Sequence, residues 1–166
     1  LRSILKMIPE VTFGIYTGET EQEEKSALSR FVRLFARDPL PNELISRARM
    51  RGSPPHLLIT NYAMLEYLLL RPDDSTLFGD PAHSTWKFIV VDEAHMYDGA
   101  IGAEIGYLIR RLRSRVTQND QLQCIATSAT LTLRRTAFHS SGPRARNCMI
   151  ALLAGGKRPV KAWPVL

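Results

Sequence analysis

Cysteines, aromatic residues and long apolar runs are scarce in this sequence. Among its 166 residues the only cysteines are Cys124 and Cys148, which lack a Cys-x-x-Cys spacing. A disulfide scaffold or a cysteine-rich zinc site is therefore not expected, and a cytoplasmic chain is favoured. No stretch reaches the roughly 20 apolar residues of a membrane-spanning helix, so we expect no membrane partner. The apolar content of 45% and the charged content of 23% are typical of a globular domain with a substantial core.

Acidic residues are absent from the end of the chain. Up to Leu131 the sequence holds 15 Lys and Arg against 16 Asp and Glu, whereas residues 132–166 hold 7 Lys and Arg and no acid. We therefore expect residues 1–131 to form the folded domain and residues 132–166 to be a basic tail. The tail is expected to be non-native to the fold, for example after a frameshift, or disordered. The alternative is a basic extension that binds nucleic acid, although most runs of charge are only solvated.

The most informative stretch is residues 88–95, Phe-Ile-Val-Val-Asp-Glu-Ala-His. Four apolar residues followed by two acids predict a strand buried on both faces, as in a parallel sheet. In open α/β sheets ligands bind outside the carboxyl ends of the strands, which is where Asp92 and Glu93 would lie. One carboxylate can hold Mg²⁺ through water, and the other can orient the attacking water in nucleotide hydrolysis. The alternative is a strand that simply ends in a polar turn.

Strands and helices alternate along the chain. Apolar runs predict strands at 11–16, 57–59 and 122–127, and apolar residues at helical spacing predict helices at 28–35, 64–69 and 101–112. This order predicts an α/β fold, with a parallel sheet flanked by helices on both faces. Polar residues follow three strands, at Thr60-Asn61, Asp92-Glu93 and Ser128-Ala129-Thr130. We expect these three strand ends to lie at one edge of the sheet.

Three further patterns give local expectations. Thr20 and Glu23 have the spacing of a capping box, which predicts a helix that begins near Thr20. Residues 71–85 are rich in Pro, Asp and Gly, which predicts a loop. Cys124 lies in the middle of a predicted strand and is expected to be a buried small hydrophobe.

Four short motifs occur in a characteristic order. They are Tyr-Thr-Gly-Glu-Thr at 16–20, Thr-Asn-Tyr-Ala-Met-Leu at 60–65, Val-Val-Asp-Glu-Ala-His at 90–95 and Ser-Ala-Thr at 128–130. The last two resemble the Walker B motif (motif II) and motif III of superfamily 2 DEAD/DEAH-box helicases. The first two resemble motifs by which these enzymes contact a nucleic-acid backbone. The surrounding sequence is similar to large bacterial members related to DNA-repair and phage-defence enzymes, and the resemblance covers roughly residues 1–131.

The resemblance implies a three-layer RecA-like fold of the P-loop NTPase type, with ATP and Mg²⁺ as cofactors. Asp92 would hold the Mg²⁺ of Mg-ATP through water, and Glu93 would activate the hydrolytic water. His95 would hydrogen-bond across the interdomain cleft or to motif III. Residues Ser128, Ala129 and Thr130 would couple the nucleotide state to strand separation.

The resemblance also implies a nucleic-acid contact. Thr60 and Asn61 would hold phosphates of one strand, with Thr17 and Gly18 nearby. A hydroxyl, an amide and the N–H groups at a helix start are all suitable phosphate ligands. Contact with the backbone alone suits an enzyme that moves along any sequence, and we expect DNA rather than RNA as the partner.

One motif of the family is missing. The phosphate-binding Walker A loop, Gly-x-x-x-x-Gly-Lys-Ser/Thr, does not occur, and the one Gly-Lys pair, Gly156-Lys157, is followed by Arg158 and lies after motif III. A second RecA-like domain is missing as well. We therefore expect an incomplete first motor domain whose upstream Walker A segment and second domain belong to a longer parent chain. Alone, it is expected to have negligible ATPase activity.

The sequence thus predicts part of an ATP-dependent nucleic-acid helicase or translocase motor. One alternative is a double-strand translocase subunit that shares the motifs without unwinding. The other alternative, from a different functional class, is a non-catalytic remnant that only binds nucleic acid.

Overall fold

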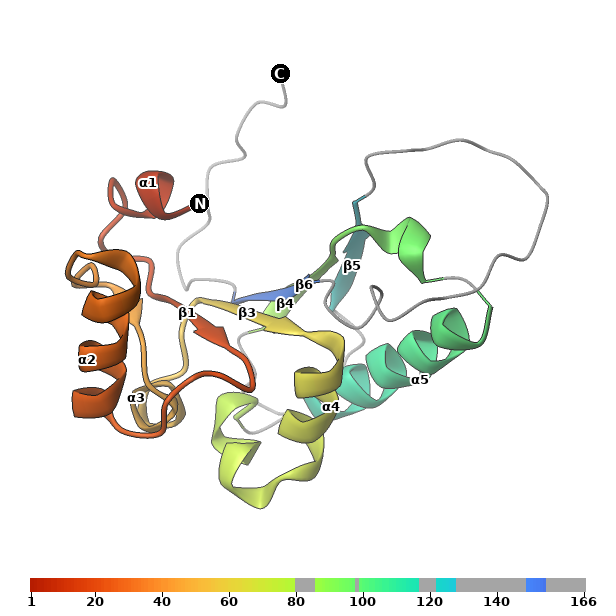
Figure 1. Cartoon of the computed structure of the whole chain (residues 1–166). Coiled ribbons are helices and arrows are strands. Elements are labelled where there is room, and N and C mark those ends of the chain that lie inside the picture. Colours follow the sequence, from red (N-terminus) through yellow and green to blue (C-terminus); the bar gives the residue numbers. More distant parts are fainter. Residues whose placement is uncertain (80–85, 98, 117–121, 128–148, 155–166) are drawn as a thin grey trace.

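The computed structural model describes residues 1–79, 86–97, 99–116, 122–127 and 149–154 (Figure 1). The helices are α1 (Arg2–Leu5), α2 (Glu24–Phe35), α3 (Arg47–Gly52), α4 (Tyr62–Leu70) and α5 (Gly99–Val116), with the 3₁₀ helices η1 (Pro72–Leu77) and η3 (Ala94–Met96). The strands are β1 (Phe13–Tyr16), β2 (Glu43–Leu44), β3 (Leu57–Asn61), β4 (Trp86–Val91), β5 (Gln123–Ala126) and β6 (Met149–Ala154). All six strands belong to one sheet, in the order β2-β1-β3-β6-β4-β5.

The sheet is mixed. The pairs β1–β2, β1–β3 and β4–β5 are parallel, as predicted, but β6 runs antiparallel to both of its neighbours, β3 and β4. The predicted α/β class, with a sheet flanked by helices, is confirmed, whereas the prediction of a purely parallel sheet is wrong for β6. Residues 149–154, Met-Ile-Ala-Leu-Leu-Ala, are apolar throughout, which is the composition of a strand buried on both faces.

The position of β6 concerns the basic tail directly. This strand comes from residues 132–166 and lies in the middle of the sheet, between β3 and β4. Ile150 and Leu152 are fully buried in it. The division of the chain at Leu131 remains a prediction, but six residues beyond it are part of the sheet.

Side chains along each strand point alternately to the two faces of the sheet, and buried apolar residues form one cluster on each face. On one face, Leu58, Ile89 and Leu152 pack with the buried residues of α4, η1 and α5. On the other face, Phe13 and Leu57 pack with Leu5 of α1. Figure 1 shows α4 and α5 on the same side of the sheet. Helices therefore contribute to both faces, and the larger cluster lies under α4 and α5.

Some local expectations are corrected. Helix α2 begins at Glu24, later than the capping box predicts, because the Thr20 hydroxyl bonds within the preceding turn. The predicted loop 71–85 contains η1, which buries Asp74. Cys124 is exposed rather than buried, because β5 is the last strand of the described sheet and all four of its residues are exposed.

Within the described residues, no helix is both long enough and apolar enough to cross a membrane.

Candidate active site and nucleic-acid interface

The polar strand ends lie at one edge of the sheet. The register aligns Tyr16 with Thr60, Thr60 with Ile150, Ile150 with Val91, and Val91 with Ala126. Because these residues form one row across five strands, the residues that follow β1, β4 and β5, together with the last residue of β3, emerge at the same edge. We call this group the carboxyl edge; it comprises Thr17, Asn61, Asp92 and Thr127.

The spacing along the carboxyl edge follows from the strand separation. Adjacent strands lie about 4.8 Å apart, so Asn61 and Asp92, which are two strands apart, are separated by roughly 10 Å. The prediction that the strand ends meet at one edge is confirmed for the 60–61 and 92–93 motifs. The third predicted strand end, Ser128-Ala129-Thr130, lies outside the described residues.

Asp92 is held by the neighbouring strand β5. Its Oδ1 accepts hydrogen bonds from the Thr127 hydroxyl at 2.5 Å and from the Glu93 N–H at 3.0 Å. The Thr127 N–H donates to the Val91 carbonyl at 2.9 Å, and the Ala94 N–H donates to the Thr127 carbonyl at 2.8 Å. Thr127 therefore fixes both the backbone and the carboxylate of the turn that follows β4.

Sequence reasoning did not select Thr127 as a site residue. A hydroxyl residue directly after a strand that pairs with the acid-bearing strand can indicate such a partner for Asp92. This indication becomes available only when the register shows that β5 lies beside β4. Within the described part of the chain, the second carboxylate oxygen of Asp92, Oδ2, accepts no hydrogen bond, and the residue is exposed. This oxygen is available to a ligand.

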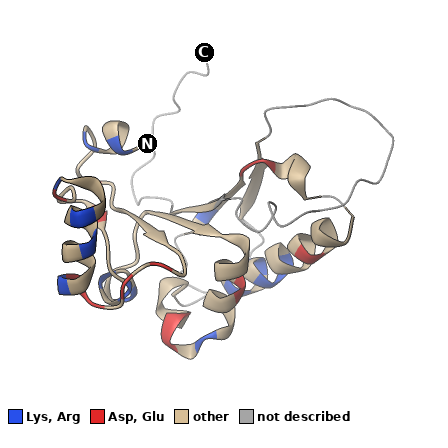
Figure 2. Ribbon diagram, viewed as in Figure 1, with Lys and Arg blue, Asp and Glu red and all other residues tan. Residues whose placement is uncertain are grey.

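Glu93 has an unusual backbone conformation. Its φ of 51° and ψ of 44° are left-handed, which costs a non-glycine residue roughly 1–3 kcal/mol. Its Oε2 lies 3.2 Å from Nδ1 of His95, and both side chains are partly exposed, so an ion pair here contributes little to stability. The turn thus brings Glu93 and His95 together beside Asp92. In Figure 2 the acidic segment after β4 is red.

Helix α5 packs closely against this turn. A Cβ atom at Gly102 would lie 2.6 Å from the carbonyl oxygen of Tyr97, which is closer than van der Waals contact permits. Glycine is therefore required where the first turns of α5 meet the chain just after His95. This contact sets the position of the turn relative to α5.

The predicted nucleic-acid residues occupy different environments. Thr60 is fully buried, and its hydroxyl donates to the Tyr16 carbonyl at 2.7 Å, so it joins β3 to β1. Asn61 is the N-cap of α4, and its Oδ1 accepts from the Met64 N–H at 2.8 Å. Gly18 is exposed, and a Cβ there would lie 4.0 Å from Cε of Met64. The loop after β1 and the start of α4 are therefore neighbours, and Thr60 supports them from within.

A buried polar network lies beneath the end of β1. The Tyr16 hydroxyl donates to Asp74 Oδ1 at 2.6 Å, and Arg51 donates to the same oxygen at 2.6 Å and to the Tyr16 hydroxyl at 3.1 Å. Burial and the hydrogen bond to Asp74 raise the pKa of Tyr16 to about 12. The network fixes η1 and α3 against β1. It was missed by sequence reasoning because residues 71–85 were predicted to be a loop.

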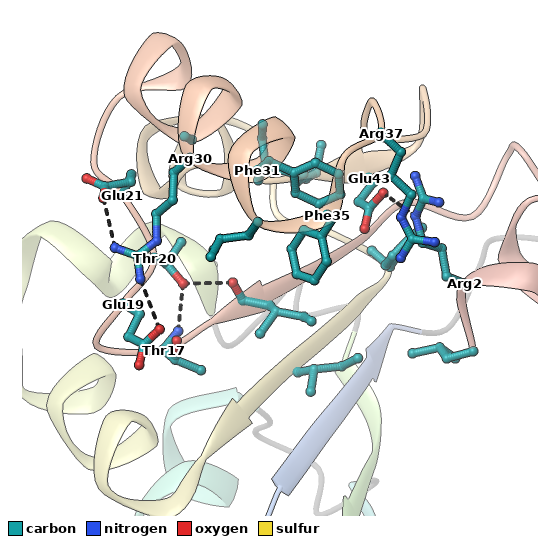
Figure 3. Close-up of a pocket in the computed structure, with 18 residues that line it drawn as sticks. Arg2, Thr17, Glu19, Thr20, Glu21, Arg30, Phe31, Phe35, Arg37 and Glu43 are labelled. Carbon is teal, nitrogen blue, oxygen red and sulfur yellow. Dashed lines mark hydrogen bonds and ion pairs between the residues drawn. The ribbon is translucent and has the colours of Figure 1, made fainter.

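A groove of about 340 Å³ lies away from Asp92 and Glu93, between α2 and the sheet. Phe31 and Phe35 of α2 face it, as Figure 3 shows. Most of its charged side chains pair with one another: Arg30 lies 3.0 Å from Glu19 and 3.2 Å from Glu21, and Arg2 lies 2.9 Å from Glu43. An apolar groove whose charges are mostly paired does not suit a nucleoside triphosphate, and we do not place the nucleotide there.

The fold and the carboxyl edge define the class: an α/β domain of the partial RecA-like type. The family model of the DEAD/DEAH box helicases matches residues 39–137. This chain belongs to the DEAD/DEAH box helicase family.

Several curated proteins are similar to this chain. Druantia protein DruE of Escherichia coli (strain UMEA 4076-1) is 38% identical over 125 residues, which cover 70% of this chain and 7% of that protein. The ATP-dependent helicase HRQ1 of Saccharomyces cerevisiae is 29% identical over 141 residues, covering 77% of this chain and 10% of that protein. The uncharacterized ATP-dependent helicase MJ1574 of Methanocaldococcus jannaschii is 33% identical over 89 residues, 53% of this chain and 13% of that protein.

The chain thus spans only 7 to 13% of the length of these relatives. No solved structure matches it significantly.

Proposed function

We propose that this chain supplies part of the first motor domain of an ATP-dependent nucleic-acid helicase. The supporting observation is that one edge of the sheet carries the acid pair of the 90–95 motif and, roughly 10 Å away, the strand end of the 60–65 motif. The residues proposed for ATP hydrolysis, Asp92 and Glu93, are then close to Asn61, which is proposed to bind nucleic acid. Such adjacency is what coupling between the two requires. The compartment we propose is the cytoplasm, where ATP and DNA meet.

The proposed nucleotide site uses Asp92, Glu93 and His95. The exposed Asp92 carboxylate has an Oδ2 that no described residue contacts by a hydrogen bond, which suits a hydrated Mg²⁺ that keeps most of its water and binds through one or two carboxylates. Bound there, Mg²⁺ would neutralise charge on the phosphates of ATP. The Thr127 hydroxyl orients Asp92 for this role. Glu93 orients and deprotonates the attacking water, and His95 limits the directions in which its carboxylate points.

The proposed nucleic-acid site uses Thr17, Gly18 and Asn61, with Thr60 beneath them. Helix α4 begins at Tyr62, so its first N–H groups and its dipole favour a phosphate at the carboxyl edge. We propose DNA as the partner, held by its backbone and not read by sequence. We also propose that the nucleotide state is coupled to this nucleic-acid contact through Ser128, Ala129 and Thr130.

ATP hydrolysis with and without single-stranded DNA tests the proposal. The full natural product of the gene should hydrolyse ATP faster when DNA is present. Replacing Glu93 with Gln should lower turnover by about 10²–10⁴-fold, the usual contribution of a general base, while leaving DNA binding intact. Asn61→Ala should instead weaken DNA binding. A full-length Glu93→Gln protein with normal turnover would refute the assignment.

Assays of the isolated 166-residue chain and of the full-length protein distinguish the remaining alternatives. We propose that it lacks measurable turnover, because it has no Walker A loop to hold the β- and γ-phosphates. Turnover by the isolated chain that Glu93→Gln abolishes would contradict this. In the full-length protein, ATPase activity without strand separation would indicate a translocase, and DNA binding without ATPase activity would indicate a non-catalytic remnant.

A further inference from the structure

Arg47, at the start of α3, contacts the loop that follows β1. One nitrogen of its guanidinium, Nη2, donates to the Thr17 carbonyl at 3.1 Å and to the Gly18 carbonyl at 3.0 Å. Its guanidinium carbon lies 5.3 Å from the centre of the Tyr16 ring, within the range of a cation–π interaction. A single side chain thus holds consecutive peptide groups of a predicted nucleic-acid loop.

Arg47 differs from the arginines around it. Arg30, Arg49 and Arg51 form ion pairs with Glu19 and Glu21, with Glu24 and with Asp74, respectively. Within the described part of the chain, no carboxylate lies in ion-pair distance of Arg47, and its buried Nε has no hydrogen-bond partner. Its backbone is also fixed, because the Arg47 N–H donates to the Glu21 carbonyl at 2.9 Å. The guanidinium is therefore dedicated to the loop.

The orientation of the two carbonyls determines where the amide groups point. In a planar trans peptide the C=O and the following N–H point in opposite directions. Because the carbonyls of Thr17 and Gly18 point towards Arg47, the N–H groups of Gly18 and Glu19 point away from it. Neither N–H donates to another described residue. Successive outward N–H groups form a concavity that suits an anion.

The rest of the loop is consistent with this arrangement. The Thr20 hydroxyl accepts from the Thr17 N–H and donates to the Ile15 carbonyl, both at 2.9 Å, as Figure 3 shows. The carboxylate of Glu19, which would repel an anion, is paired with Arg30 at 3.0 Å. The loop is therefore closed on its inner side, while its outer side presents donors.

We propose that Arg47 is a positioning residue for nucleic acid: it holds the Thr17 and Gly18 carbonyls so that the Gly18 and Glu19 N–H groups bind a phosphodiester of the backbone. This inference rests on the proposed function, since it assumes that nucleic acid binds at the carboxyl edge. Arg47 acts through the loop and makes no ion pair with the phosphate itself.

Binding of a fluorescent single-stranded DNA to the full natural gene product, followed by anisotropy over a range of salt concentrations, tests the proposal. Arg47→Ala and Arg47→Lys should both weaken binding by about tenfold, because lysine keeps the charge but lacks the planar fork of arginine. The slope of log K against log salt should not change, since no ionic contact is lost. A direct phosphate contact would instead reduce the slope by about 1. Arg49→Ala, on the same helix, is the control and should bind normally.

A second pair of variants tests the amide without touching Arg47. The Thr20 N–H donates to the Thr17 carbonyl at 3.2 Å, which makes Gly18 the second residue of a turn, a position where proline is common. Gly18→Pro removes one outward N–H there and should weaken binding about as much as Arg47→Ala. Gly18→Ala keeps the N–H and meets only Cε of Met64, at 4.0 Å, so it should lose clearly less affinity than Gly18→Pro. Melting temperatures identify any variant that fails to fold, and the glycine pair then decides the question.

The outcomes separate the two proposals. A full-length protein that binds neither single-stranded DNA nor RNA would remove the proposed function. Wild-type binding that Arg47→Ala and Gly18→Pro leave unchanged would overturn the positioning role alone. Full affinity in Arg47→Lys, or a slope reduced by about 1 in Arg47→Ala, would also overturn it, because Arg47 would then act as a simple charge.

Discussion

Gly102 and Gly106 in the interior of helix α5 predict opposite responses to the same substitution. A Cβ at Gly102 would lie 2.6 Å from the carbonyl oxygen and 3.3 Å from the carbonyl carbon of Tyr97, whereas a Cβ at Gly106 meets no atom of the described residues within 4 Å. We predict that Gly102→Ala destabilises the fold and that Gly106→Ala stabilises it. Each variant is the matched control of the other.

The magnitudes follow from helix propensity and packing. Either alanine gains about 0.5–1 kcal/mol, because glycine loses more backbone entropy in a helix. At Gly106 no atom of the described part of the chain opposes this gain. At Gly102 the obstacle is a backbone atom, which cannot rotate away as a side chain can, and overpacking of this kind costs about 1–3 kcal/mol. The net loss of stability for Gly102→Ala is therefore about 0.5–2 kcal/mol.

Urea unfolding of the 166-residue chain, followed by the fluorescence of the buried Trp86, measures both changes as shifts of the midpoint. A second readout links the contact to the site, because Tyr97 lies only two residues after His95. In the full natural gene product, Gly102→Ala should lower DNA-stimulated ATP turnover, and Gly106→Ala should not. Equal shifts of the same sign in the two variants would refute the claim that α5 packs tightly on the turn after β4.

Two further predictions concern the hydrogen-bonded groups of the carboxyl edge and its support. Thr127→Val removes the 2.5 Å hydrogen bond to Asp92 and should raise the Mg²⁺ concentration needed for half-maximal ATPase activity by about 10–100-fold. Thr127→Ser keeps the hydroxyl and should behave as the wild type. An unchanged Mg²⁺ requirement in Thr127→Val would contradict this prediction. The pKa of Tyr16 is raised to about 12 from 10.0 by burial and by Asp74, so the neutral phenol stabilises the fold below pH 10 and this contribution is lost as the pH rises towards 12. The loss of stability is at most about 3 kcal/mol. Between pH 9 and 12 the free energy of unfolding should therefore fall less steeply in Tyr16→Phe than in the wild type. An identical fall in both proteins would exclude Tyr16 as the titrating group.

Much of the carboxyl edge could be predicted because its signals are local. The apolar run before Asp92 predicts a buried strand, and an acid after such a strand must lie at its carboxyl end. The apolar stripe from Ile101 to Leu112 predicts most of α5, which the structure extends to Gly99–Val116. Asn61 before the apolar residues of α4 is a recognisable N-cap. Each of these features depends only on neighbours within a few positions.

Other features depend on partners far apart in the sequence. Thr60 carries a hydroxyl that suits a phosphate, but the pleat turns it inward, and it donates to a carbonyl 44 positions away. Thr127 reaches Asp92 across 35 positions, and Tyr16 reaches Asp74 across 58. No periodicity encodes such pairs. They become visible only when the strand order and register are known.

The sequence alone determined which residues have the chemistry: the acid pair, the histidine beside it, the hydroxyl and amide groups after the strands, and the family motifs in their order. The tertiary structure decided which of them meet, because strand pairing sets neighbours that the chain order does not. It placed an apolar strand from the basic tail in the middle of the sheet, gave Asp92 its threonine partner, and turned Thr60 inward. It also directed Arg47 onto the loop after β1, an assignment that depends on α3 packing beside β1 and not on any motif.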